Sequence, residues 1–271
     1  MSVELHQEML RLLPELRTQP MPKRLTVRLG AALVARTDRP VLVMEPMRVV
    51  PSYAVPVADL DAELEPAEAG PPPEYRSIGF GDGPPLLDPS VPFAVHTADG
   101  DAVLVRVGDL TGHGFRASGL PDHVILDFEH FDWWEEDEPL MGHPRDPFHR
   151  IDVRRSSRRI RILHEDTLLA DSARPFALFE GTFPLTRWYL PPEDVVAELL
   201  PGELRTTCAY KGRATHFDVD VDGTRLENIA WTYEDPLDDA RDVRGCVAFY
   251  QERLDVEMDG AAVERVRTPW S

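Results

Sequence analysis

The chain repeats itself, and this internal duplication limits the folds that are open to it. Residues 23–60 align without a gap on residues 158–195 at an offset of 135 positions. The matched positions include Ala35 and Ala170, Arg39 and Arg174, Glu45 and Glu180, and Asp59 and Asp194. The alignment resumes at an offset of 123, and the 12 positions lost between the two offsets fall in a proline- and glycine-rich insert at residues 66–92. Two copies are too few for a repeat array, so the sequence predicts two homologous halves.

Both halves are predicted to be mostly β, with a little helix. The segments LTVRL (25–29) and IRILH (160–164) alternate apolar and polar residues, as half-buried strands do. Segments 124–128 and 247–250 are predicted to be buried strands. Asp-Gly pairs at 99–100 and 222–223 lie between such segments and indicate hairpin turns. Because the pairs align at the offset of 123, we expect the two turns to be equivalent.

Each half is also expected to contain one short helix, at residues 57–64 and 192–200, the second with a proline at its start. A further helix is predicted at residues 3–16, where apolar residues share one face and Pro14 bends or ends it. The predicted organisation is an N-terminal helical arm (1–20), a first, degenerate β-rich domain (21–138), a junction (139–157) and a second β-rich domain (158–271).

Composition argues against several classes of partner. The net charge of −19 disfavours binding to nucleic acid or to an anionic membrane surface. No apolar run approaches the roughly 20 residues of a membrane span. The N-terminus lacks the features of a signal peptide, and Cys208 and Cys246 are too few for a disulfide scaffold, so we expect a cytoplasmic protein. The abundance of arginine over lysine and the 26 prolines are typical of a GC-rich bacterial genome. The oligomeric state is not predicted.

The segment TTCAYKG (206–212) is the strongest candidate for a functional site. It contains Lys211, one of only two lysines in the chain, whereas arginine occurs 27 times. A lysine retained in such a chain is expected to do something that arginine does badly, such as losing its proton when it is desolvated.

The two halves differ in this region. At the offset of 123, the first half has Val107, Gly108 and Leu110 in place of Ala230, Trp231 and Tyr233, and it has no Tyr-Lys-Gly motif. This asymmetry predicts that the second half carries the site and that the first half supports it. Neutral divergence of a purely structural duplicate remains the alternative.

Three motifs of the second half occur in a fixed order. They are LADSARP followed by Glu180 and RWYLPPEDV (187–195), then TTCAYKG with Ala214, and then AWTYEDP (230–236). This series resembles the domain of unknown function 427 family, closely over the second half and loosely over the first. The junction HPRDPFHRID (143–152) is similar to the linker of the tandem two-domain members.

The resemblance implies a small β-rich domain similar to the β-tent folds, in a bacterial cytosolic protein of no settled activity. The label of the family hints at nucleotidyl transfer. The chain has neither a glycine-rich phosphate loop nor paired metal-binding aspartates to support that reaction.

We expect one site in the second half, built from residues able to do acid–base chemistry and from aromatic walls. The candidate catalytic residues are Lys211, Glu180 and Tyr210. The candidate substrate-binding residues are Arg187, Tyr189, Cys208, Trp231, Tyr233, His149 and Arg150. No metal and no other cofactor are predicted, because the nine histidines are scattered and no CxxC or HExxH motif occurs.

Each candidate also has a structural interpretation. Lys211 is either a desolvated amine, an anchor for a carboxylate ligand, or a structural tie to Glu180. Cys208 is either a nucleophile or a small core residue. The aromatic residues either line a pocket or fill the core.

Two functions remain open. One is a small-molecule binding protein or cofactor-independent enzyme with its pocket around Lys211. The other is a non-catalytic interaction or regulatory module that uses the acidic surface and the N-terminal helix. A cavity at Lys211 favours the first, and an exposed apolar patch favours the second.

Overall fold

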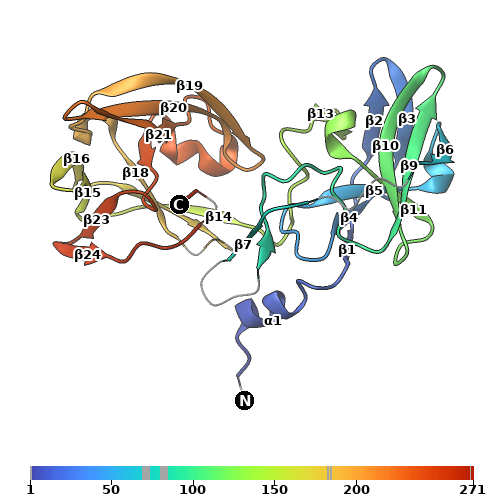
Figure 1. The fold of residues 1–271 in the computed structure, drawn as a ribbon, viewed down its shortest axis with the longest axis horizontal. Helices are drawn as coiled ribbons and strands as arrows, with labels where there is room; N and C mark the ends of the chain where they lie inside the picture. The colour runs from blue at the N-terminus through green and yellow to red at the C-terminus, as the bar shows by residue number, and fades with distance from the viewer. Residues whose placement is uncertain (1, 69–73, 80–84, 182, 184, 269) are drawn as a thin grey trace. The chain divides into compact units, whose positions relative to one another are not determined.

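The computed structural model describes residues 2–68, 74–79, 85–181, 183, 185–268 and 270–271. The chain divides into two compact units, Met1–Asp146 and Pro147–Ser271. Both are built mostly from antiparallel strands (Figure 1), which confirms the predicted mostly β fold class. Part of the predicted proline- and glycine-rich insert, at 69–73 and 80–84, lies outside the described residues.

Unit 1 contains a seven-stranded sheet and a four-stranded sheet. The seven-stranded sheet runs in the order β1 (Arg17–Pro20), β4 (Val41–Met44), β5 (Ser52–Pro56), β11 (His123–Leu126), β10 (Leu110–Ala117), β9 (Gly100–Val107), β6 (Glu63–Pro66). The four-stranded sheet runs in the order β13 (Glu138–Pro139), β12 (Asp132–Glu135), β2 (Leu25–Leu29), β3 (Ala32–Thr37). A small separate sheet pairs β7 (Ser77–Ile78) with β8 (Leu86–Leu87).

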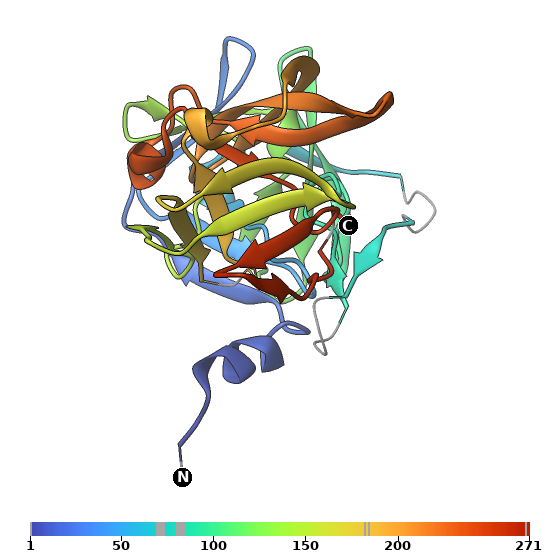
Figure 2. The ribbon, with the colours of Figure 1, turned by 90° about the vertical axis from the view of Figure 1, so that its left-hand side faces the viewer.

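Unit 2, drawn in yellow to red in Figure 2, has two sheets of the same sizes. The seven-stranded sheet runs in the order β14 (Ile151–Arg155), β17 (Phe176–Glu180), β18 (Arg187–Leu190), β22 (Val247–Phe249), β21 (Thr224–Thr232), β20 (Gly212–Val221), β19 (Leu199–Cys208). The four-stranded sheet runs in the order β16 (Thr167–Ser172), β15 (Ile160–His164), β23 (Asp255–Met258), β24 (Ala261–Val263).

The strand order is the same in both units when the β7–β8 hairpin is set aside. The predicted equivalence of the two Asp-Gly turns is nevertheless wrong. Asp222-Gly223 forms the turn between β20 and β21, whereas the corresponding turn between β9 and β10 is Gly108-Asp109. Asp99-Gly100 lies at the start of β9 instead. The offset of 123 holds for the last strands but not for this hairpin, because the connection that follows the hairpin is residues 233–246 in unit 2 and only residues 118–122 in unit 1.

The helices are shorter than predicted. The N-terminal helix is α1 (Leu5–Arg11) rather than residues 3–16, and residues 17–20 of the predicted arm form strand β1. The predicted helices at 57–64 and 192–200 are single 3₁₀ turns, η1 (Val57–Asp59) and η3 (Pro192–Asp194). Leu199 and Leu200 pair with β20, so sheet pairing overrides the local helical pattern. Two further 3₁₀ segments were not predicted, η2 (Phe128–His130) and η4 (Asp238–Val243).

The predicted junction at 139–157 is not a separate linker throughout. Its residues 151–155 form β14, the edge strand of the large sheet of unit 2, and pair with β17. The candidate His149 therefore lies directly before a strand of the unit that carries Lys211.

Each seven-stranded sheet buries apolar side chains on both faces. In unit 2, Trp188 and Leu190 pack with Ile160 and Ile162 between the two sheets. The opposite face of the large sheet carries a second apolar cluster. This second face of the sheet holds the candidate site.

Candidate functional site

Strand alternation brings most of the candidate residues to one face of the large sheet of unit 2. Successive side chains of a strand point to opposite faces, so Trp188 and Leu190 enter the core between the sheets and their neighbours face the other way. The candidates on this other face, or packed against it from the β19–β20 turn, are Glu180, Arg187, Tyr189, Tyr210, Lys211, Trp231 and Tyr233. The period-2 pattern thus places side chains far apart in sequence next to one another.

A tight turn between β19 and β20 brings Lys211 over this face. Gly212 has a φ of +102°, a conformation that residues with a Cβ rarely adopt. A Cβ at this position would lie 3.4 Å from the carbonyl oxygen of Asp235 and from the backbone nitrogen of Leu237. The nitrogen of Leu237 donates a hydrogen bond to the carbonyl oxygen of Lys211 at 3.1 Å. The glycine is therefore required by the turn.

Lys211 forms an ion pair with Glu180. The ammonium donates a hydrogen bond to Oε1 of Glu180, and the two side chains are 12% and 19% exposed. Burial alone would lower the pKa of Lys211, but the negative charge of Glu180 outweighs it and raises the pKa above the usual value for lysine. Burial would raise the pKa of Glu180, and the charge of Lys211 lowers it instead. Both groups are therefore ionised at neutral pH.

His149 lies on the other side of the same carboxylate. Its Nε2 is 3.8 Å from Oε2 of Glu180, and its ring centroid is 4.5 Å from that of Tyr210. The charge of His149 also contributes to the lowered pKa of Glu180. Glu180 is thus placed between an ammonium and an imidazole.

Three aromatic side chains stand beside the ion pair. Nε1 of Trp231 donates a hydrogen bond to the hydroxyl oxygen of Tyr189 at 3.4 Å, and the ring of Tyr233 lies 6.4 Å from that of Tyr189. Burial raises the pKa of Tyr189 to about 12, so the phenol stays protonated at neutral pH. Burial also raises the pKa of Tyr233 well above its usual value. We call Lys211, Glu180, His149, Tyr189, Tyr210, Trp231 and Tyr233 the Lys211 cluster.

Arg187 adjoins this cluster but is held by a carboxylate that the sequence did not reveal. Its guanidinium forms two hydrogen bonds with Glu252, at 2.7 and 2.9 Å, and a third with the carbonyl oxygen of Phe249 at 3.0 Å. It also lies 5.0 Å from the ring centroid of Trp231. Arg187 is only 6% exposed. No sequence pattern links Glu252 to Arg187, because the two lie on different strands or loops.

The remaining two candidates differ in their surroundings. Cys208 is partly buried at the end of β19 and packs against the same apolar cluster as Tyr189 and Tyr210. Arg150 has a side chain that is 77% exposed and lies 3.8 Å from Asp152. The structure therefore brings Cys208 to the Lys211 cluster and leaves Arg150 at the surface.

The comparison with protein families bears on this unit. The profile described as "Domain of unknown function (DUF427)" matches residues 152–260, which include all the strands of unit 2 except the first residue of β14 and the last strand, β24. Unit 2 is similar to this family over most of its length, and we call it the DUF427 domain. No curated protein matches the chain. The family description assigns no reaction, so the chemistry of the domain has to be argued from its side chains.

The described part of the chain has neither a cluster of metal ligands nor a helix that could span a membrane. Among the residues that the structure describes, no group of three or more His, Cys, Asp or Glu side chains is arranged to hold a metal ion. The described helices are all too short or too polar to cross a bilayer.

Unit 1 has a buried ion pair at the position that corresponds to Glu180 in the DUF427 domain. Glu45, at the offset of 135, lies 2.9 Å from Nδ1 of His96 and accepts hydrogen bonds from the backbone nitrogens of Thr97 and Ala98. Nε2 of His96 lies 3.0 Å from Asp127. These contacts outweigh burial and raise the pKa of His96 to about 9. The first unit therefore keeps the carboxylate and has a histidine where the second has a lysine.

The aromatic counterpart is also retained. Trp231 pairs with Ala248 on β22, and Phe115 pairs with Ile125 on β11, which is the position of Ala248 at the offset of 123. The ring of Phe115 stacks on His96 with centroids 4.2 Å apart. The expectation that Gly108 replaces Trp231 is therefore wrong, because the offset of 123 does not hold for the β9–β10 hairpin. Phe115 is the residue that corresponds to Trp231.

Proposed function

We propose that the DUF427 domain binds a small organic molecule at the Lys211 cluster, or acts on one without a cofactor. The observation that supports this most is an ammonium that is 12% exposed, held in its charged form by Glu180 and placed beside buried phenol and indole groups. Buried charges cost free energy unless they are paired, and perturbed ionisable groups gather at functional sites.

The direction of the pKa shifts narrows the chemistry. A lysine with a raised pKa is protonated at neutral pH, so Lys211 is a poor nucleophile and a poor Schiff-base former. As a charged donor it suits a carboxylate, a carbonyl oxygen or a developing oxyanion. His149, beside Glu180, supplies a side chain of the type that exchanges protons near neutral pH.

The surrounding rings narrow the shape of the ligand. Tyr210, Trp231 and Tyr233 lie in the apolar cluster beside the ion pair and are 8%, 7% and 5% exposed, so a ligand would reach their faces only by displacing neighbouring side chains. Flat organic molecules pack on such rings, and one or two polar groups then fix their orientation. We therefore propose a small aromatic or unsaturated acid, or its carbonyl analogue, as the ligand.

A ligand screen tests the proposal. Small aromatic and unsaturated acids are screened by the thermal shift of the wild-type protein, and each hit is repeated on Lys211→Met and Lys23→Met. Lys23 is a matched control, because it is the other lysine of the chain and is also paired with a carboxylate, that of Glu135 in unit 1. We expect hits to stabilise wild type and Lys23→Met and to lose their effect on Lys211→Met.

A hit that stabilises all three proteins equally would place the ligand elsewhere and refute the siting at Lys211. Binding and turnover are separated by incubating each hit with the protein and following its mass. Turnover that disappears in Glu180→Gln while binding persists would assign acid–base work to the carboxylate.

A further inference from the structure

The N-terminal helix carries an exposed apolar stripe. Leu5, Met9 and Leu12 are 78%, 44% and 54% exposed, and Val3 before them is 65% exposed. Their spacing of four and three residues places them along one side of a helix. These four are among only six exposed large apolar side chains in the described part of unit 1. The stripe is therefore a concentrated patch rather than a scatter of single residues.

The side of the helix next to this stripe is already occupied. Leu10 and Leu13 pack in a small cluster with Ile78 and Leu86. The backbone nitrogen of Met47 also donates a hydrogen bond of 2.7 Å to the carbonyl oxygen of Leu13. These contacts fix the helix to its own unit and leave Leu5, Met9 and Leu12 exposed.

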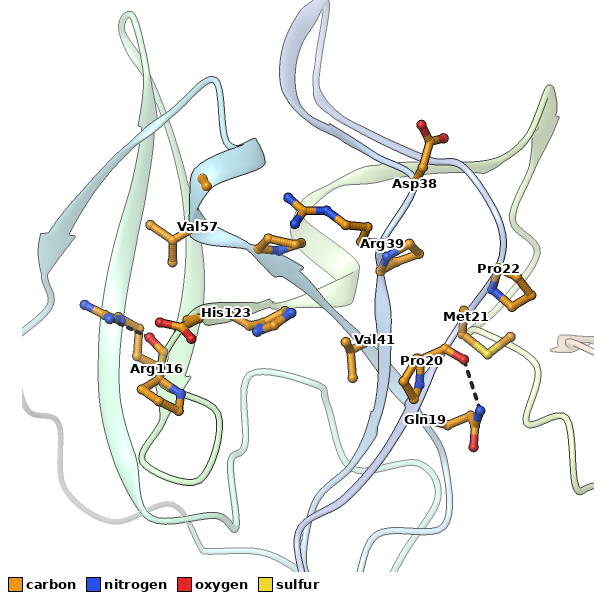
Figure 3. A pocket seen from close by; sticks show the side chains of 15 residues that line it. Gln19, Pro20, Met21, Pro22, Asp38, Arg39, Val41, Val57, Arg116 and His123 are labelled. Atoms are coloured by element: carbon orange, nitrogen blue, oxygen red, sulfur yellow. Dashed lines mark hydrogen bonds between the residues drawn. The ribbon is translucent and has the colours of Figure 1, made fainter.

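Unit 1 also has an open groove of about 1150 Å³ on its large sheet (Figure 3). Its apolar lining includes Val41 and Val57 together with five prolines, those at 20, 22, 40, 56 and 121. Arg39, Arg116 and His123 lie at its walls, and so do Asp38 and Asp122. Nδ1 of His123 is buried without a hydrogen-bond partner among the described residues.

In unit 2, a short helical segment covers the part of the large sheet that corresponds to this groove. There the connection from β21 to β22 covers residues 233–246 and contains η4, which packs against the edge strand β14. Ala240 and Val243 of η4 are fully buried. In unit 1 the corresponding connection is only residues 118–122, and the groove lies beside β1, the counterpart of β14. The groove is thus the place that a short helical segment fills in the other unit.

We propose that α1 of one copy of the chain docks in this groove of a second copy, through Leu5, Met9 and Leu12. The exposed side chains of the helix and much of the groove lining are apolar, and the equivalent sheet position in unit 2 accepts a short 3₁₀ helix. This inference does not depend on the ligand proposed for the Lys211 cluster.

The charges agree with the pairing. Residues 2–16 contain three glutamates and one arginine, a net charge of −2. Arg116 at the groove donates to the carbonyl oxygen of Pro121, and no carboxylate lies within ion-pair distance of it in the described part of the chain. Its remaining donors can meet Glu4 of the incoming helix, since Glu8 already pairs with Arg11 of its own helix at 2.6 Å. Because each copy carries −19, we expect the association to be tighter at high than at low salt.

Docking within a single chain is disfavoured by the connection. Leu12 is only five positions before Arg17, where β1 begins, and β1 itself lines the groove through Gln19 and Pro20. To reach the groove, the helix would have to fold back and withdraw Leu10 and Leu13 from their cluster. A second copy meets the groove without that loss.

The test is the mass of the protein in solution as a function of concentration, by light scattering after gel filtration and by sedimentation. We expect wild type to form dimers or larger assemblies. Leu5→Glu with Met9→Glu in the helix, and Val57→Glu in the groove, should each weaken association about tenfold or more. Leu110→Glu is the control, because Leu110 is 44% exposed on unit 1 and lies outside the groove.

A mixing experiment separates the two surfaces. The helix variant keeps an intact groove and the groove variant keeps an intact helix, so an equimolar mixture should form a one-to-one complex that neither variant forms alone. Thermal unfolding of each variant verifies that it is folded. A monomeric wild type at every concentration, undiminished association of the helix variant, or no complex in the mixture would overturn the proposal.

Discussion

Replacement of Lys211 by methionine should lower the free energy of unfolding by about 3 kcal/mol. Removing one partner of a buried ion pair typically costs about 3–5 kcal/mol, because the other charge stays buried without compensation. The value should fall at the lower end, since His149 lies 3.8 Å from Glu180 and still offsets part of its charge. Methionine fills a similar volume, so no large cavity adds to the loss.

The assay is calorimetric unfolding at neutral pH. For a unit of this size, a loss of about 3 kcal/mol should lower the melting temperature by roughly 10 °C. Lys23→Met is the control, because Lys23 is 37% exposed and its ion pair with Glu135 should contribute no more than about 1 kcal/mol. The double variant Lys211→Met with Glu180→Met buries no charge and should recover much of the loss.

Two results would contradict this reasoning. If Lys211→Met has the same melting temperature as the wild type, the ammonium is not paired in a buried position. If the double variant is less stable than Lys211→Met alone, groups other than Lys211 stabilise the charge of Glu180, and Lys211 is not its main partner.

Three further outcomes follow from other residues. The pKa of His96 is about 9 in the folded protein, above the unfolded value near 6.5, so its contribution to stability is complete below about pH 6.5 and is lost as the pH rises through 9. Wild type and His96→Gln should therefore differ in unfolding free energy by about 3 kcal/mol at pH 6 and by little at pH 10, as measured by denaturant unfolding. Gly212→Ala forces a Cβ into a φ of +102° and should cost about 1–3 kcal/mol in urea unfolding, whereas a wild-type midpoint would show that the turn relaxes freely. Arg187→Met leaves the fully buried carboxylate of Glu252 without its cation and should destabilise the protein by about 3 kcal/mol or more at pH 7, with a smaller loss at pH 4. An equal loss of stability at both pH values would exclude the charge of Glu252 as the cause.

The sequence predicted the sheets where apolar alternation is strong. The segments 25–29 and 160–164 form β2 and β15 with the predicted bounds. The hairpin alignment failed because an Asp-Gly pair indicates a turn without specifying which two strands it joins. The helix at 192–200 failed because Leu199 and Leu200 gain more from pairing with β20 than from local helix.

The convergence of the candidate residues was predictable in part. Period-2 alternation fixes which residues of β18 and of β21 share a face within each strand, but the pairing of Tyr189 and Trp231 with Ala248 of β22 is what brings the two side chains to the same face. The partner of Arg187 was not predictable, because Glu252 approaches it through the fold and no spacing connects them. His96 was missed for a similar reason, since it follows an insert that breaks the alignment.

The comparison of the two units separates what the fold requires from what a site would require. Both units bury a carboxylate, Glu45 or Glu180, against a cation that lies close to an aromatic side chain, Phe115 or Tyr189. A feature present in both is most simply explained as part of the architecture. Tyr189, by contrast, has Ala54 as its counterpart at the offset of 135, and the cation changes from His96 to Lys211. Loss of stability should therefore follow removal of either cation, whereas loss of ligand binding should follow removal of Lys211 alone.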